Sequence, residues 1–207
     1  MYLKNNSSNS SKKRIILLSI PVFFANLSTP LVGIIDTGLM GNLGEAKYLA
    51  ALSIATSLMT MIIWSFGFLR MGTVGIVAQL FAKKDYREIV RTLVRNFIIA
   101  IIISILIILL KPVLINLVDS YFSTSLETQN LIYTYLSIRI LSIPAELVIY
   151  ILIGFYLGLQ KTNISSLIVI TMSILNIVFS SLFVLSFNLD VFGVALGTMI
   201  ASYFTVI

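Results

Sequence analysis

Apolar positions in this 207-residue chain come in long runs that are separated by short polar stretches. A helix needs about 20 mainly apolar residues to cross the hydrocarbon core of a bilayer, and runs of roughly that length recur along the chain. The pattern predicts six helices, at 15–41, 47–81, 88–110, 128–158, 163–186 and 191–207. It therefore predicts an all-α, polytopic membrane protein.

The polar stretches predict the segments between and before these helices. Residues 1–14 are rich in Asn and Ser and end in three basic residues, which predicts a disordered tail. The second apolar run is interrupted by glycines near 72–75. The basic stretch 83–95 carries apolar residues at helical spacing, which predicts an interfacial helix that leads into the third span. Residues 112–127 are predicted to lie along the opposite surface.

The first apolar run is expected to be a retained transmembrane helix and not a signal peptide. It is too long, it contains Pro21 and Pro30, and it has no cleavage site of small residues before Asp36. Pro21 and Pro30 are able to bend this retained helix, and Pro144 is able to bend the fourth.

The distribution of Lys and Arg predicts the orientation. Ten of them fall in the N-terminal tail, in the loop between the second and third helices and in the loop between the fourth and fifth, whereas Lys47 and Lys111 lie on the other side. The positive-inside rule then places the N-terminus in the cytoplasm and the chain in the cytoplasmic membrane. The last run spans only about 26 Å before Ile207, so the sequence is interpreted as truncated in its sixth helix; a short final helix is the alternative.

Composition narrows the classes of function. Charged residues make up 11% of the chain, against about 25% in a soluble domain. The chain contains no Cys and no His, which argues against disulfides, thiol chemistry and the usual zinc sites. No phosphate-binding glycine loop or nucleophile–base set is found, so we expect no enzyme and no organic cofactor. The net charge of +6 follows the topology, so we expect no nucleic-acid partner.

Four charges fall within or near the predicted spans. Asp36 is the only charge of its apolar run, and a carboxylate there costs about 3 kcal/mol on insertion scales. Such an acid predicts a functional role, here in ion-coupled transport. Arg139 and Glu146, seven residues apart, either neutralise each other or take part in coupling or the substrate path. Arg70 either joins them or extends to the inner headgroups.

Small and polar residues also recur at helical spacing. Helix packing through close backbone approach is predicted for seven positions: Ala51, Ala55, Gly154, Gly158, Gly193, Gly197 and Ala201. Asn176 and Ser180 lie one turn apart in the fifth helix, and Thr198 lies in the sixth. By themselves these three residues predict no more than an interhelical hydrogen bond.

Several stretches resemble the MATE transporters, the multidrug and toxic compound extrusion family, and in particular its DinF-like branch. They are IPVFFANLSTPLVGIIDTGLMGNLG (20–44), WSFGFLRMGTVGIVAQ (64–79), SIRILSIPAELVIYILIGFYLGLQKTN (137–163) and VFGVALGT (191–198). The resemblance implies one six-helix lobe, the N-terminal one, of a twelve-helix exporter of organic compounds that is driven by proton or sodium antiport.

The resemblance also assigns a cation site. The acid of the first helix matches Asp36 and the bending proline matches Pro21, while Asn176 and Thr198 match the polar residues of the fifth and sixth helices. Family members often carry a second acid where this chain has Ser180. The departure favours proton coupling through Asp36 alone, although a sodium ion held at Asp36 by neutral oxygens stays open.

The implied partners are the lipid bilayer, a small organic cation or amphiphile as substrate, and the missing C-terminal lobe or a second copy of the chain. Two alternatives stay open beside the antiporter. One is a truncated remnant or membrane scaffold that transports nothing. The other is a flippase for lipid-linked oligosaccharides, against which the scarcity of basic residues argues, since only Arg139 and Arg70 are placed to line a cavity.

Overall fold

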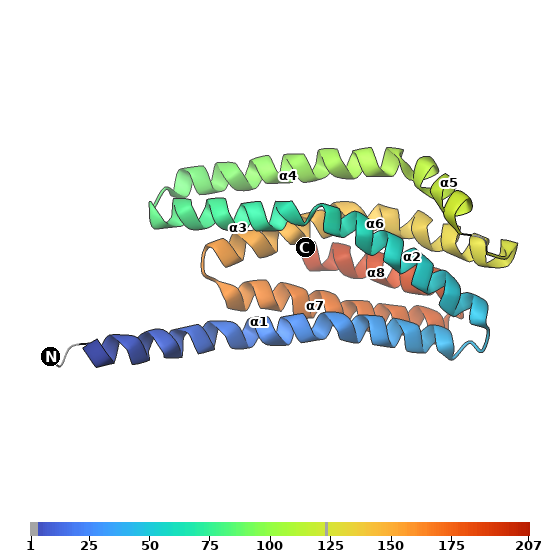
Figure 1. Ribbon diagram of the computed structural model, residues 1–207, viewed down its shortest axis with the longest axis horizontal. Coiled ribbons are helices and arrows are strands. Elements are labelled where there is room, and N and C mark those ends of the chain that lie inside the picture. The colour runs from blue at the N-terminus through green and yellow to red at the C-terminus, as the bar shows by residue number, and fades with distance from the viewer. Residues whose placement is uncertain (1–3, 123) are drawn as a thin grey trace.

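The computed structural model describes the backbone of residues 4–122 and 124–207, with side chains from Ser19 onward except at 117, 119 and 120. The described part is an elongated bundle in which α1 and α4 lie on opposite sides (Figure 1). In chain order the elements are α1 (Lys4–Gly41), α2 (Ala46–Ser65), α3 (Gly67–Ala82), α4 (Tyr86–Leu109), α5 (Lys111–Tyr121), α6 (Leu126–Gly158), α7 (Thr162–Ser181), the π-helical turn η1 (Leu182–Ser186) and α8 (Asp190–Val206).

Among the described residues, five helical stretches are long and apolar enough to cross a membrane. They are Ser19–Gly41, Ala46–Ala82, Tyr86–Leu109, Leu126–Gly158 and Thr162–Ser186. The sixth predicted span corresponds to α8, an apolar helix of 17 residues. The fold class expected from the sequence, a bundle of apolar helices, is therefore confirmed.

Three local expectations differ from the structure. The backbone is helical from Lys4 rather than disordered up to residue 14, because no Gly or Pro interrupts the chain before Pro21 and an existing helix extends at little cost. Residues 1–3 lie outside the described part. The second span breaks at Phe66, immediately before Gly67, rather than at the glycines near 72–75. The basic stretch forms the first turns of α4 itself, which starts at the N-cap Asp85 with no separate interfacial helix.

The helix α6 is the centre of the bundle. Half of its most apolar window is buried, against 17–28% for the other four spans. Its fully buried side chains include Ile132, Ile140, Ile143, Leu147 and Ile151. Because α6 also carries Arg139 and Glu146, these charges lie inside the bundle and not toward lipid.

Glycines allow the helices around α6 to approach closely. A Cβ atom on Gly158 would stand 2.7 Å from the Cβ atom of Val77 in α3, and one on Gly154 would stand 2.6 Å from the carbonyl oxygen of Arg70. On α8, a Cβ atom on Gly197 would stand 2.6 Å from the backbone nitrogen of Ser180 in α7. The packing role predicted for these small residues is confirmed.

We predict that Gly197→Ala destabilises the chain, because the added methyl group meets the backbone of α7 and not a flexible side-chain end. Overpacking of this kind costs about 1–3 kcal/mol. The matched control is Gly75→Ala, where a Cβ atom meets nothing within 4 Å, and its gain in helix propensity is up to about 1 kcal/mol. Thermal unfolding of the purified variants in detergent measures both, and equal midpoints for the two variants would contradict the packing argument.

Candidate cation site and intramembrane charges

Asp36 is buried where α1 meets α7 and α8. Its side chain is 7% exposed, and one carboxylate oxygen, Oδ1, has no hydrogen-bond partner. The hydroxyl of Ser180 in α7 interacts with the carboxylate, and the positive charge of Arg139 in α6 reaches it. A buried carboxylate without a full set of partners is costly, so its charge has to be met by a cation of some kind.

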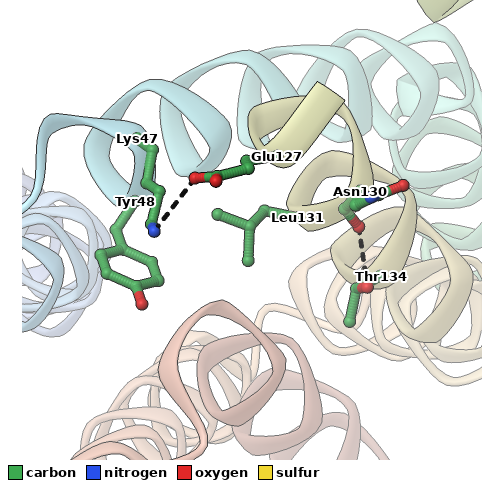
Figure 2. A pocket seen from close by; sticks show the side chains of 6 residues that line it. All are labelled: Lys47, Tyr48, Glu127, Asn130, Leu131 and Thr134. Carbon is green, nitrogen blue, oxygen red and sulfur yellow. Dashed lines mark hydrogen bonds and ion pairs between the residues drawn. The ribbon is translucent and has the colours of Figure 1, made fainter. Parts of the chain in front are cut away.

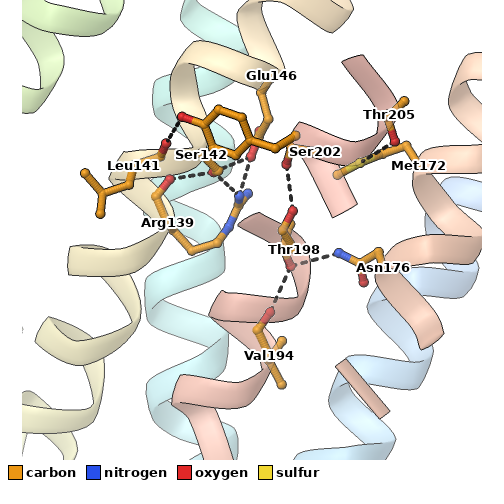
Figure 3. A network of polar contacts seen from close by, with 11 residues as sticks. Arg139, Leu141, Ser142, Glu146, Met172, Asn176, Val194, Thr198, Ser202 and Thr205 are labelled. Carbon is orange, nitrogen blue, oxygen red and sulfur yellow. Dashed lines mark hydrogen bonds and ion pairs between the residues drawn. The ribbon is translucent and has the colours of Figure 1, made fainter. Parts of the chain in front are cut away.

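The other predicted members of the cation site are hydrogen-bonded to one another, and one of them, Ser180, interacts with Asp36. Asn176 Nδ2 donates to Thr198 Oγ1 over 2.8 Å and so joins α7 to α8, as Figure 3 shows. Ser180 Oγ donates to Asn176 Oδ1 over 3.4 Å. Asn176, Ser180 and Thr198 are all buried. The interhelical hydrogen bond predicted from the sequence is therefore present, and Ser180 connects it to Asp36.

These groups offer oxygen atoms to a cation but little charge. The amide oxygen of Asn176 and the hydroxyls of Ser180 and Thr198 are neutral, and Asp36 supplies the carboxylate. In the described part of the chain, no group of three or more His, Cys, Asp or Glu side chains is placed to hold a metal ion. The set fits a proton or a weakly held monovalent cation better than a divalent metal, which prefers several carboxylates.

Arg139 and Glu146 form an ion pair within α6. Arg139 Nη1 donates to Glu146 Oε1 and to Ser142 Oγ, and Ser142 Oγ lies 2.6 Å from the same glutamate oxygen (Figure 3). The arginine and glutamate side chains are 10% and 13% exposed. The helix continues through Pro144 between them. Mutual neutralisation thus occurs on one helix face, seven residues apart, and not between helices.

Arg139 keeps part of its hydrogen-bonding capacity unused. Its Nε atom is buried without a partner. The fully buried Tyr135, one turn earlier on α6, interacts with the guanidinium through its hydroxyl. Tyr135 and Ser142 were not among the predicted site residues, although their spacing of four and three residues from an intramembrane arginine is a signal that identifies them.

Arg70 and Pro21 stand apart from this group. Arg70 lies in α3, is half-buried, and makes no ion pair with an acidic side chain in the described part of the chain. Its charge acts on Tyr150 of α6, one turn beyond Glu146. Pro21 lies in α1 about four turns before Asp36, and α1 is continuous through Pro21 and Pro30.

Two hydroxyls connect α1 to α7 on the side toward Pro21. Ser28 Oγ and Ser173 Oγ are 3.1 Å apart. Each also has an acceptor in its own helix, because Ser28 Oγ lies 2.7 Å from the carbonyl oxygen of Ala25 and Ser173 Oγ lies 3.0 Å from that of Val169. A serine hydroxyl has one proton, so the contact between the helices competes with the contacts inside them.

A hollow lies between the first turns of α2 and α6, toward the end of α1 that is farther from Pro21. Its volume is about 260 Å³, and Figure 2 shows Lys47 and Glu127 facing each other across it. Lys47 Nζ lies 3.2 Å from Glu127 Oε2 and 2.7 Å from Glu45 Oε2. These exposed ion pairs connect α2 to α6 but leave the hollow without a free charge of either sign, so Asp36 stays the stronger candidate for a functional site.

We predict that Thr198→Val lowers stability by about 1 kcal/mol, because the buried amide of Asn176 loses its acceptor while side-chain volume is kept. The control is Thr56→Val, since Thr56 Oγ1 donates only to carbonyls of its own helix. Chemical unfolding in detergent measures the difference. A smaller loss for Thr198→Val than for Thr56→Val would show that the bond between α7 and α8 contributes nothing.

Comparison with known proteins gives the family. The family model MatE matches residues 21–182. DNA damage-inducible protein F of Escherichia coli K12 is 33% identical over 198 residues, which are 96% of this chain and 43% of that protein. Multidrug export protein MepA of Staphylococcus saprophyticus is 24% identical over 190 residues, or 92% of this chain and 42% of MepA. The chain thus spans less than half the length of these relatives.

Solved structures agree on the fold. An outward-facing multidrug resistance MATE family transporter of the MOP superfamily superimposes with a TM-score of 0.86 at 23% identity, over 94% of this chain and 43% of that one. A MOP superfamily transporter from Pyrococcus furiosus gives a TM-score of 0.82 at 24% identity over the same shares. The chain therefore belongs to the MATE family of transporters and has the fold of one lobe, the N-terminal one.

Proposed function

We propose that this chain is the ion-coupling lobe of an antiporter that exports small organic cations or amphiphiles across the cytoplasmic membrane. The observation that carries the proposal is the buried carboxylate of Asp36, which has an unpartnered oxygen and interacts with Ser180, the first member of a hydrogen-bonded chain through Asn176 to Thr198. The relatives named for multidrug export support the class of substrate. Under the proposal the N-terminus faces the cytoplasm, as the positive-inside rule indicates.

The coupling ion is a proton. The amide and hydroxyl oxygens near Asp36 supply no second negative charge, and Ser180 stands where family members often place one. A single carboxylate is fully neutralised by one proton, which binds without a shell of several ligands. Sodium would need Asn176, Ser180 and Thr198 to complete its coordination, and two of these three already hydrogen-bond to each other over 2.8 Å.

Transport follows from the change of charge on Asp36. The ionised carboxylate has to be solvated by water or a cation, which keeps the space between α1 and α7 open. Once the carboxylate is neutral it no longer needs this solvation. The helix α1 then bends near Pro21 and closes against α7, which expels the substrate. Two six-helix lobes have to rock against each other in this scheme, so a second lobe or a second copy of this chain is the partner.

We predict that Asp36→Asn abolishes proton-driven export, because the amide cannot change charge. Export is measured as the efflux of a fluorescent organic cation from energised cells. The chain is expressed alone and, in a second set of cells, together with the remaining part of the E. coli relative. The control is Glu127→Gln, which removes an exposed carboxylate at the end of the bundle and leaves Lys47 paired with Glu45. Unchanged efflux with Asp36→Asn would refute the coupling role. Absence of efflux in every pairing, with the chain folded in the membrane, would instead favour a scaffold or remnant.

We also predict that Ser180→Asp adds sodium dependence to export. The new carboxylate stands beside Asp36, and two acids raise the affinity for a metal cation and make simultaneous ionisation without one unfavourable. Export driven by a sodium gradient at constant pH should appear in the variant and be absent in the parent. Ser180→Asn, which adds similar volume without charge, serves as the control, and the same sodium response in both would rule out the charge argument.

A further inference from the structure

Two buried atoms of opposite character are left without partners in the middle of the bundle. Asp36 Oδ1 is an acceptor on a carboxylate, and Arg139 Nε is a donor on a guanidinium. Both residues are more than nine-tenths buried, at 7% and 8% exposure. The charge of Arg139 already reaches Asp36, yet no hydrogen bond joins them. The arginine has five N–H donors in a planar fork, and in this structure Nη1 is engaged while Nε has no partner.

The engaged edge is held by Glu146. Arg139 Nη1 donates to Glu146 Oε1 and to Ser142 Oγ, which ties the guanidinium to its own helix. Tyr135 is buried beside the guanidinium and near Asp36 as well. Two carboxylates thus compete for one arginine, and Glu146 has it in this structure.

We propose that Arg139 is an internal competitor of the coupling cation for Asp36, and that Glu146 is the positioning residue that holds Arg139 back. When Asp36 carries its cation, Arg139 stays with Glu146. When the cation leaves, the free Nε edge turns to Asp36 Oδ1 and occupies the place of the cation. This inference rests on the proposed function, since it assumes that Asp36 is the carboxylate that binds the ion.

The competition explains how Asp36 releases its cation without leaving an isolated negative charge in an apolar bundle. A buried carboxylate that loses its cation is penalised unless another positive group replaces it. The charge of Arg139 on the central helix already reaches Asp36, and under this proposal a change of side-chain rotamer brings the guanidinium to the carboxylate. Around this group, α7 and α8 contribute only the neutral Asn176, Ser180 and Thr198, and the other nearby cation, Arg70 of α3, acts on Tyr150 next to Glu146.

The test uses the complete 207-residue chain in lipid nanodiscs and two probes, protons taken up on acidification and the binding of radioactive sodium at fixed pH. Glu146→Gln releases Arg139 to Asp36, so we expect half-saturation with the cation to need at least a tenfold higher cation concentration. For protons this corresponds to one pH unit or more, which is the size of effect that a neighbouring opposite charge has on a carboxylate. Adding Arg139→Met to Glu146→Gln removes the competitor and should restore binding to the parental level. Arg70→Met is the matched control and should leave binding unchanged.

A purely structural role for the ion pair gives a different pattern. Glu146→Gln would then lower the unfolding temperature but leave the cation affinity of the folded chain as it was, and that result would overturn the inference. If Asp36→Asn left cation binding intact, the proposed function itself would fail. If Asp36→Asn removed binding while Glu146→Gln did not weaken it, only the competition would be refuted.

A second measurement reads the pairing of Arg139 through stability and not through cation uptake. In the Glu146→Gln background, Arg139 pairs with Asp36, so the shifts in unfolding temperature caused by Asp36→Asn and by Arg139→Met should be strongly non-additive. In the parent background, measured at a cation concentration that keeps Asp36 occupied, Arg139 stays with Glu146 and the two shifts should be much closer to additive. Equal additivity in both backgrounds would contradict the exchange of partners even if one variant folded poorly.

Discussion

The cost of placing ionised groups among apolar helices governs the arrangement of this lobe. Asp36 of α1 and the Arg139–Glu146 pair of the central α6 are buried in the same bundle, where each charge has to be met by another. One arginine and two carboxylates leave a deficit of one positive charge. That deficit is the physical basis for the proposed cation site, to which the neutral Asn176, Ser180 and Thr198 add no further charge.

Hydrophobic runs were sufficient to predict the helices, because the requirement for about 20 apolar residues leaves few alternatives. The residues of the cation site were predicted through the family resemblance, and the intramembrane position of Asp36 came from the sequence itself. Other features depend on information that a linear pattern lacks. The break at Phe66 depends on local backbone geometry, and the choice of Arg139 between Asp36 and Glu146 depends on side-chain rotamers in three dimensions.

The close contact of α7 with α8 connects packing to the site. Gly197 has no side chain, which brings the backbone of Ser180 against α8 and presents the Ser180 hydroxyl to Asn176 and Asp36. A position chosen for its small size thus determines where the neutral oxygens lie. The glycines at 154 and 158 have the corresponding effect between α3 and α6, and they place Arg70 near Tyr150.

The two serines between α1 and α7 have a consequence for the rate at which these helices separate. Ser28 and Ser173 hydrogen-bond to each other, but each already has a carbonyl of its own helix within reach. When the helices part, both protons turn inward and no polar group is stranded in hydrocarbon. The activation barrier for parting therefore contains little contribution from broken hydrogen bonds, which suits the opening and closing of this contact in the proposed antiport cycle.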